Sequence, residues 1–75
     1  MKELVEFIAG SIVSQPDRVQ VSVEETGSSA NLQLSVGPED VGIVIGRRGQ
    51  MVNSIRSLLR VMGARSGVGV NLKIE

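Results

Sequence analysis

The chain has 75 residues, with eight basic and eight acidic side chains, so its formal net charge at pH 7 is zero. It contains no cysteine and no histidine, which excludes disulfides and the common zinc clusters and fits a reducing cytoplasm. A chain of this length is expected to form one domain over residues 1–75. Glu3 and Glu6 interrupt the apolar segment at the N-terminus, so we expect neither a signal peptide nor a membrane partner.

The first half predicts one helix followed by a hairpin. Apolar residues recur at helical spacing over residues 2–14, and Pro16 disfavours helical geometry at the residue before it. Apolar and polar residues then alternate over residues 19–24 and again over residues 32–36, on either side of "TGSSA". This pattern is typical of an antiparallel hairpin with one buried face.

The second half is ambiguous at its start. "VGIVI", residues 41–45, is β-branched, so propensity alone predicts a strand, but so short a segment does not settle the matter. A helix follows, marked by Met51, Val52, Ile55, Leu58, Leu59 and Met62. Its apolar stripe is expected at Met51, Ile55, Leu58 and Met62, and Gly63 is expected to terminate it. Alternation over residues 68–74 predicts a last strand. If residues 41–45 are helical, this strand lies parallel to the preceding one.

Charge is distributed unevenly along the chain. Residues 1–40 carry two basic and seven acidic side chains, a net charge of −5, whereas residues 41–75 carry six basic side chains and one acidic, a net charge of +5. Such asymmetry predicts one basic face, which suits a nucleic-acid partner, although solvated surface charge is the simpler interpretation.

The loop "GRRG" is the main candidate site. Gly46, Arg47, Arg48 and Gly49 stand directly before the strongest predicted helix. A helix N-terminus offers unpaired N–H groups to an anion, glycine lets a phosphate approach the backbone closely, and arginine forms forked contacts with phosphate oxygens. The two-residue spacer is too short for the phosphate loop of nucleotide hydrolases. We therefore expect the amides of residues 46–49 to face an open cleft that holds a phosphate backbone.

With its surroundings, "DVGIVIGRRGQMV" resembles the KH domain signature. The additional helix and strand before that motif match the type II arrangement, α-β-β-α-α-β, and the resemblance covers essentially the whole chain. "SQPD" and "SIRSLLR" are similar to the small bacterial KH proteins of the KhpA family. The resemblance implies an α+β fold with a three-stranded mixed sheet and three helices packed on one face. It also implies that residues 39–45 form a short helix, against their propensity.

The resemblance implies that the loop binds RNA. A KH domain holds about four nucleotides of a single strand at its GxxG loop, so Gly46 and Gly49 are the loop glycines here, and Arg47 and Arg48 face the phosphates. The implied role is that of a KhpA-like RNA chaperone or regulator. Implied partners are a second copy of the chain, a larger KH-containing protein of the KhpB kind, or both.

Further positions carry weaker expectations. Gly42 either lets the sugar-phosphate chain pass close to the short helix or packs tightly against the sheet. Ile45 and Val52 are expected in the core. Ile43 stands where the family commonly has a basic residue, so one electrostatic contact is absent.

The predicted helix adds a stripe that the motif does not contain. At about 100° per residue, Asn53, Arg56 and Arg60 fall on one line with Gly49, away from the predicted apolar stripe. This line either tracks a longer nucleic acid, meets an acidic partner or is solvated surface.

Other functions are less well supported by the sequence. Phe7 is the only aromatic residue, so the stacking platforms of RRM and OB modules cannot be built. Neither a metal site nor a cofactor site is indicated, and the scattered carboxylates do not suggest an enzyme. An adaptor that keeps the KH fold but pairs with proteins alone remains open, with Val61 and residues 63–69 as interface candidates. Single-stranded DNA also remains open as a ligand.

Overall fold

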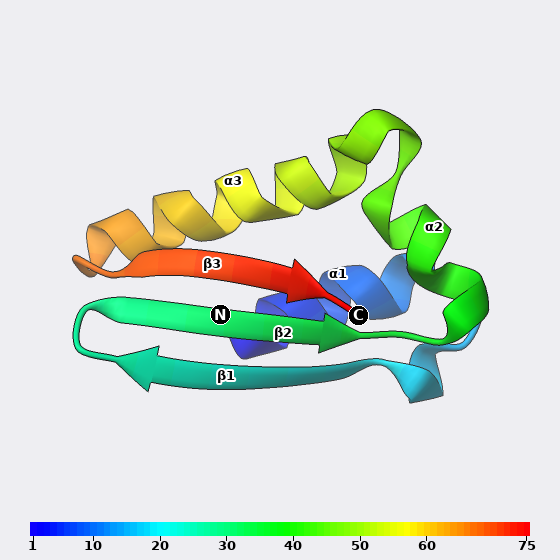
Figure 1. The fold of residues 1–75 in the computed structure, drawn as a ribbon, viewed down its shortest axis with the longest axis horizontal. Coiled ribbons are helices and arrows are strands. Elements are labelled where there is room, and N and C mark those ends of the chain that lie inside the picture. The colour runs from blue at the N-terminus through cyan, green and yellow to red at the C-terminus, as the bar shows by residue number, and fades with distance from the viewer.

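The computed structural model describes all residues, 1–75, and has three helices of α type and three strands. The elements in chain order are α1 (Lys2–Ile12), β1 (Gln20–Thr26), β2 (Ser29–Ser35), α2 (Val41–Ile45), α3 (Gln50–Arg65) and β3 (Gly69–Ile74), with single 3-10 turns at Pro16–Arg18, Pro38–Asp40 and Arg47–Gly49. This is the α-β-β-α-α-β order that the sequence predicts (Figure 1).

The three strands form one mixed sheet in the order β1-β2-β3. β1 pairs with β2 in antiparallel register, with Thr26 opposite Ser29, and β2 pairs with β3 in parallel register, with Leu32 opposite Leu72. Gly27 forms the hairpin turn at φ 58°, a left-handed value that glycine adopts without strain. The predicted hairpin and the predicted parallel strand are therefore both confirmed.

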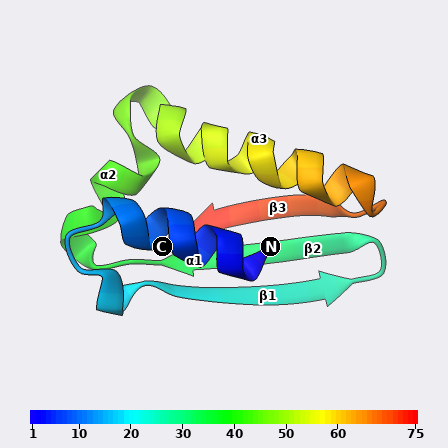
Figure 2. The same ribbon diagram turned by 180° about the vertical axis from the view of Figure 1, so that it is seen from behind.

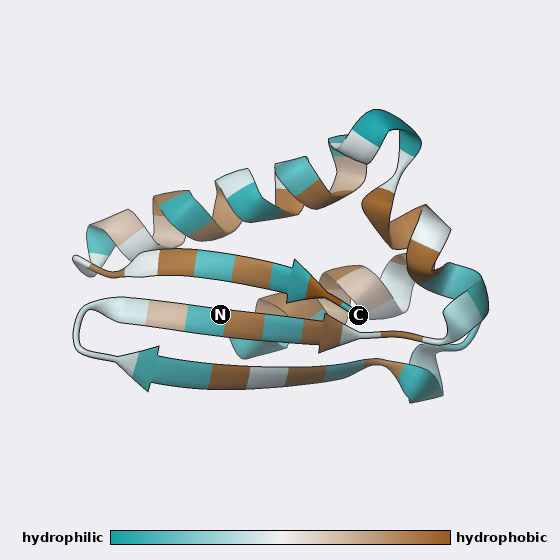
Figure 3. Cartoon of the chain, in the orientation of Figure 1, coloured by the Kyte–Doolittle hydropathy of each residue, from teal (hydrophilic) through white to brown (hydrophobic).

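Alternation along the strands separates the two faces of the sheet. Buried residues on β2 and β3 alternate with polar ones that remain open to solvent, which Figure 3 shows as alternating bands of colour. The helices cover the apolar face, and the view from behind in Figure 2 shows α1 lying across it. One cluster forms the core: Val5, Ala9, Val21, Ala30, Leu32, Leu34, Val36, Val44, Val52, Ile55, Leu59, Val70 and Leu72.

α2 is a short helix, as the family resemblance implies and contrary to its β propensity. Val44 is fully buried, whereas Ile43 and Ile45 on either side of it are exposed. One buried side chain in five residues is not the alternation that a strand of this sheet needs. The packing of Val44 against the core therefore overrides local preference.

α3 is longer than the sequence predicts. Gly63 does not terminate it but lies buried inside it. A Cβ at this position would collide with the Val68 carbonyl and the Val70 side chain, so only glycine fits there. The actual terminator is Gly67 at φ 70°, with hydrogen bonds from the amide of Val68 to the Gly63 carbonyl and from the amide of Gly67 to the Ala64 carbonyl. Residues 63–65 are therefore helical rather than part of a flexible segment.

α1 ends two residues earlier than predicted, since Val13 is already extended. Neither α1 nor any other helix combines the length and the apolar character needed to cross a bilayer.

Candidate nucleic-acid interface

The short helix α2 connects a tightly bonded junction to the GRRG loop. At the junction, Asp40 is only 4% exposed, and its Oδ1 accepts hydrogen bonds from the amide of Ser14 (3.0 Å) and the Ser14 hydroxyl (2.8 Å). Its Oδ2 accepts a hydrogen bond from the amide of Gln15 at 3.2 Å. The bond from the Ser14 amide is the main reason that the pKa of Asp40 is lowered, while burial opposes this shift. An ionised Asp40 therefore fixes the start of α2 to the end of α1.

The loop itself has an unusual backbone. Gly46 has φ 79° and ψ 175°, a region essentially restricted to glycine, and a Cβ there would lie 2.6 Å from the Cβ of Met51. Gly49 is left-handed at φ 75°, and Arg48 is the only non-glycine residue of the chain with a positive φ, at 56°. Both glycines are thus required for conformation, as the motif predicts, and Arg48 stores strain beside them.

Only two of the four loop amides are free. The amide of Gly46 donates to the Gly42 carbonyl at 2.9 Å, and the amide of Gly49 donates to the Gly46 carbonyl at 3.2 Å. The amides of Arg47 and Arg48 have no backbone acceptor. The expectation that all amides from 46 to 49 face a ligand is therefore wrong for the two glycines, whose N–H groups close the turn.

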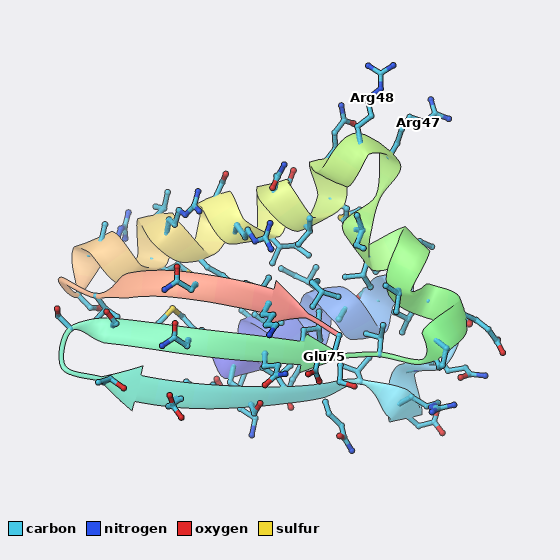
Figure 4. All side chains as sticks on the ribbon, in the orientation of Figure 1. Arg47, Arg48 and Glu75 are labelled. Carbon is cyan, nitrogen blue, oxygen red and sulfur yellow. The ribbon has the colours of Figure 1, made fainter.

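Arg47 and Arg48 project from the bend between α2 and α3, away from the body of the protein (Figure 4). Both are exposed, and neither forms an ion pair or a hydrogen bond with another side chain. Glu75 is the only acidic residue of the second half, and it lies well apart from them at the end of β3. The two guanidinium groups are available to a ligand.

The fold also separates charge in space. The arginines of the loop and of α3 lie on the side of β3, since α3 packs against that strand. Glu24 and Glu25 belong to β1, at the opposite edge of the sheet. These arginines and these two glutamates thus lie at opposite edges of the sheet.

Around the loop, three expectations are resolved. Nothing lies within 4 Å of a Cβ built on Gly42, so tight packing against the sheet does not explain this glycine. Ile45 is 38% exposed rather than part of the core, because Val44 fills the core position and the chain turns away at Gly46. Val52 is buried, as predicted. Gly42, Ile43 and Ile45 are thus all exposed on α2, the helix that leads into the loop.

The predicted polar stripe of α3 is present, but its members differ. Asn53 and Arg60 are exposed, whereas Arg56 is partly buried and bonds to β3. The Nε and Nη2 atoms of Arg56 both donate to the backbone carbonyl of Leu72, at 3.2 and 3.0 Å. Sequence reasoning could not find this partner, because a backbone acceptor is not specified by residue type.

The apolar face of α3 is rotated relative to the predicted stripe. Its buried positions are Val52, Ile55, Leu59 and Gly63. Leu58 and Met62, expected to be apolar contacts, are exposed together with Val61, which is 58% exposed. An apolar strip of α3 therefore lacks a partner within the chain.

Hollows of the surface lie elsewhere. One is lined by side chains of the open sheet face, such as Asn31 and Lys73, and the other lies between the start of α1, β1 and Glu75. Neither includes residues of the loop or of α3, so the expected open cleft at residues 46–49 is not formed by this chain, and the loop projects from the surface instead. The structure contains no group of three or more acidic side chains that could hold a metal ion.

Comparison with known proteins agrees with this architecture. Residues 2–74 match the family described as "KhpA/KhpB, KH domain". The chain is 40% identical over 74 residues to the RNA-binding protein KhpA of Halalkalibacterium halodurans, covering 99% of this chain and 97% of the relative. It is 43% identical over 72 residues to RNA-binding protein KhpA of Borreliella burgdorferi, covering 96% and 88%, and 40% identical over 74 residues to that of Clostridium acetobutylicum, covering 99% of both.

No solved structure matches the chain. The family match and these relatives extend over nearly the full length, and the GRRG loop lies inside every one of these alignments. The chain therefore belongs to the KhpA/KhpB family of KH-domain proteins.

Proposed function

We propose that this protein binds single-stranded RNA, without catalysis, along the surface formed by α2, the GRRG loop and the first turns of α3. The observation that carries this proposal is the loop itself, where two exposed, unpaired arginines and two free amides stand together before a 16-residue helix. The relatives are RNA-binding KhpA proteins by name, which supports RNA as the ligand.

This geometry supports a contact with the RNA backbone. The amides of Arg47 and Arg48 donate to phosphate oxygens, and the N-terminus of α3 adds the positive end of its dipole. The two guanidinium groups add charge-assisted contacts. Gly46 and Gly49 hold the turn that leaves those amides free, so they act through conformation rather than through their own N–H groups.

The surface beside the loop suits the rest of a short strand. The free space above Gly42 lets a sugar lie close to α2, and the exposed Ile43 and Ile45 offer apolar contact to bases. Asn53 and Arg60 continue this surface along α3. About four nucleotides fit the size of such a module, and few charges imply weak binding by one copy.

The decisive experiment is the double substitution Arg47→Asp and Arg48→Asp. We expect it to abolish binding of a short single-stranded oligouridine in fluorescence anisotropy, while circular dichroism shows an unchanged fold. A matched control is Lys2→Asp with Arg18→Asp, which changes the net charge equally at exposed positions outside the proposed surface. Equal loss of binding in both variants, or none in the loop variant, contradicts the proposal.

Salt dependence gives a second measure of the same contact. Two to three phosphate contacts, at about 0.7 per contact for single strands, give a slope of log K against log salt near −2. A slope steeper than about −5 contradicts a contact confined to this loop. Competition with oligodeoxythymidine in the same titration establishes whether the protein distinguishes RNA from DNA.

We also propose that the protein acts as a pair, either with a second copy or with a larger KH-containing protein. The exposed strip of Leu58, Val61 and Met62 on α3 favours such an interface, and pairing raises the avidity of two weak sites. We expect Val61→Glu to lower the mass measured by sedimentation without unfolding the chain. An unchanged mass contradicts this interface.

The same strip favours a second candidate function, an adaptor that pairs with proteins and binds no RNA. The Arg47→Asp and Arg48→Asp variant separates the two candidates. If the protein is only an adaptor, the variant still pairs, and RNA titrations of the variant and the wild type are the same.

We propose that the RNA-binding protein, one domain over residues 1–75, serves as an RNA chaperone or regulator in the cytoplasm. Crosslinking in cells followed by sequencing of the attached RNA tests that role.

A further inference from the structure

The contact between Arg56 and β3 is not explained by attraction to phosphate. β3 is an edge strand. The Leu72 carbonyl points away from β2, as its hydrogen bonds from Arg56 of α3 indicate. The amides of Gly69 and Glu75, three residues before and after Leu72, point the other way, toward β2, and donate to the carbonyls of Ser28 and Leu34. Arg56 therefore covers an acceptor on the open edge of the sheet.

This contact fixes the orientation of the guanidinium group. Nε and Nη2 share one acceptor, so one side of the planar group is held against the strand, and Nη1 makes a long hydrogen bond of 3.4 Å to Asn53 Oδ1. A guanidinium carries five N–H groups. Three are accounted for, which leaves one free N–H on each of Nη1 and Nη2.

Arg56 therefore replaces an acceptor at the edge of β3 by donors. A bare edge would present the Leu72 carbonyl as an acceptor, whereas the covered edge presents a pair of donors in a fixed plane. Arg56 lies on the same side of α3 as Gly49 and about two turns further on, a rise of about 10 Å. A strand of RNA held at the loop and running along α3 reaches this pair.

We propose that Arg56 reads a base, by donating both free N–H groups to a nucleobase that presents two adjacent acceptors. Guanine offers O6 and N7, and cytosine offers N3 and O2, whereas adenine and uracil offer no adjacent pair of acceptors. The inference rests on the proposed function, because it needs RNA at the loop. It assigns Arg56 to base selection and leaves phosphate contact to Arg47 and Arg48, whose side chains are unrestrained.

The test uses the full chain and short oligouridines that carry one central guanosine, cytidine or adenosine. We expect guanosine or cytidine to bind about tenfold more tightly than oligouridine, the usual range for one forked base contact, and adenosine to give no gain. In the wild-type protein, 7-deazaguanosine or 3-deazacytidine, which lack one of the two acceptors, should remove the gain. A gain that survives these analogues overturns the inference.

Substitutions locate the effect. Arg56→Lys keeps the charge but loses the planar fork, so we expect the base preference to vanish while affinity for oligouridine changes by less than about twofold. Arg65→Lys is the matched control, since Arg65 is exposed in the last turn of α3, outside the proposed RNA surface, and it should keep the preference. If Arg56→Gln flattens the salt dependence and leaves base preference intact, Arg56 binds phosphate and the inference is wrong.

Failure of this inference is distinct from failure of the proposed function. Wild-type protein that does not bind oligouridine contradicts RNA binding as such, whereas binding without any preference among the probes contradicts base reading by Arg56 alone. Thermal melting checks whether an Arg56 variant is folded. Should it unfold, the deaza analogues in the wild-type titration still decide the question.

Discussion

The two ends of α2 differ in how their polar groups are satisfied. At the Asp40 end, a buried carboxylate accepts three hydrogen bonds from residues 14 and 15, and the side chain is almost fully covered. At the Gly46 end, two amides and two guanidinium groups have no partner in the protein. One end is completed by the fold and the other keeps free donors, so a helix of five residues connects an anchor to the proposed binding loop.

The largest expected effect is at the loop end, where the backbone is most restricted. Gly46→Ala places a Cβ against Met51 in a conformation that only glycine tolerates, so we expect a loss of about 3 kcal/mol in the free energy of unfolding, measured by urea titration. The loop should also lose RNA affinity, since its turn cannot form as before.

Gly67→Ala is the control for that variant. Gly67 has a similar φ of 70° but open space around it, so the cost is that of strain alone, about 1 kcal/mol. RNA affinity should be unchanged, because Gly67 ends α3 far from the loop. Equal stability losses at both glycines would show that Met51 does not restrict position 46.

At the anchored end, the expected effect is on acid stability. The pKa of Asp40 is lowered in the folded state, so its stabilisation is present above the unfolded pKa of about 4 and disappears as the pH falls through the folded value. Asp40→Asn should lower stability at neutral pH and flatten the decline below pH 4, as measured by urea midpoints over pH. Parallel pH profiles of the variant and the wild type would exclude Asp40 as the anchor.

The smallest expected effect is a gain in stability. Gly42→Ala adds a methyl group in free space on a helix, which should raise the free energy of unfolding by up to about 1 kcal/mol. If RNA passes over α2, the same methyl group should weaken RNA binding. Gly10→Ala in α1 is the matched control, with open space but no expected contact, and should stabilise the protein without changing affinity.

How much the sequence predicts depends on the kind of signal. Periodicity predicts α1, the hairpin and β3, because each buries one side of a regular element. It fails at α2, where the burial of Val44 outweighs β propensity, and only the family resemblance gives the correct helix there. The loop glycines are predicted by their chemistry, and their positive φ values agree.

The remaining errors share a cause, which is that contacts between distant residues leave no local pattern. Gly63 looks like a helix terminator, but it lies inside α3, where Val68 and Val70 leave no room for a side chain. Arg56 looks like one more free cation, but the Leu72 carbonyl holds it. Both partners are supplied by the segment that returns along the sheet, and neither can be identified before the strand order is known.

The parallel pairing of β2 with β3 has a kinetic consequence. Its hydrogen bonds join strands separated by residues 36–68, so they cannot form until that whole segment, loop included, has become compact. The β1–β2 turn closes locally and early by comparison. We therefore expect the segment that carries the proposed RNA contact to be the connection whose ordering limits the rate of folding, so stiffening α2 should accelerate refolding more than any change in the hairpin.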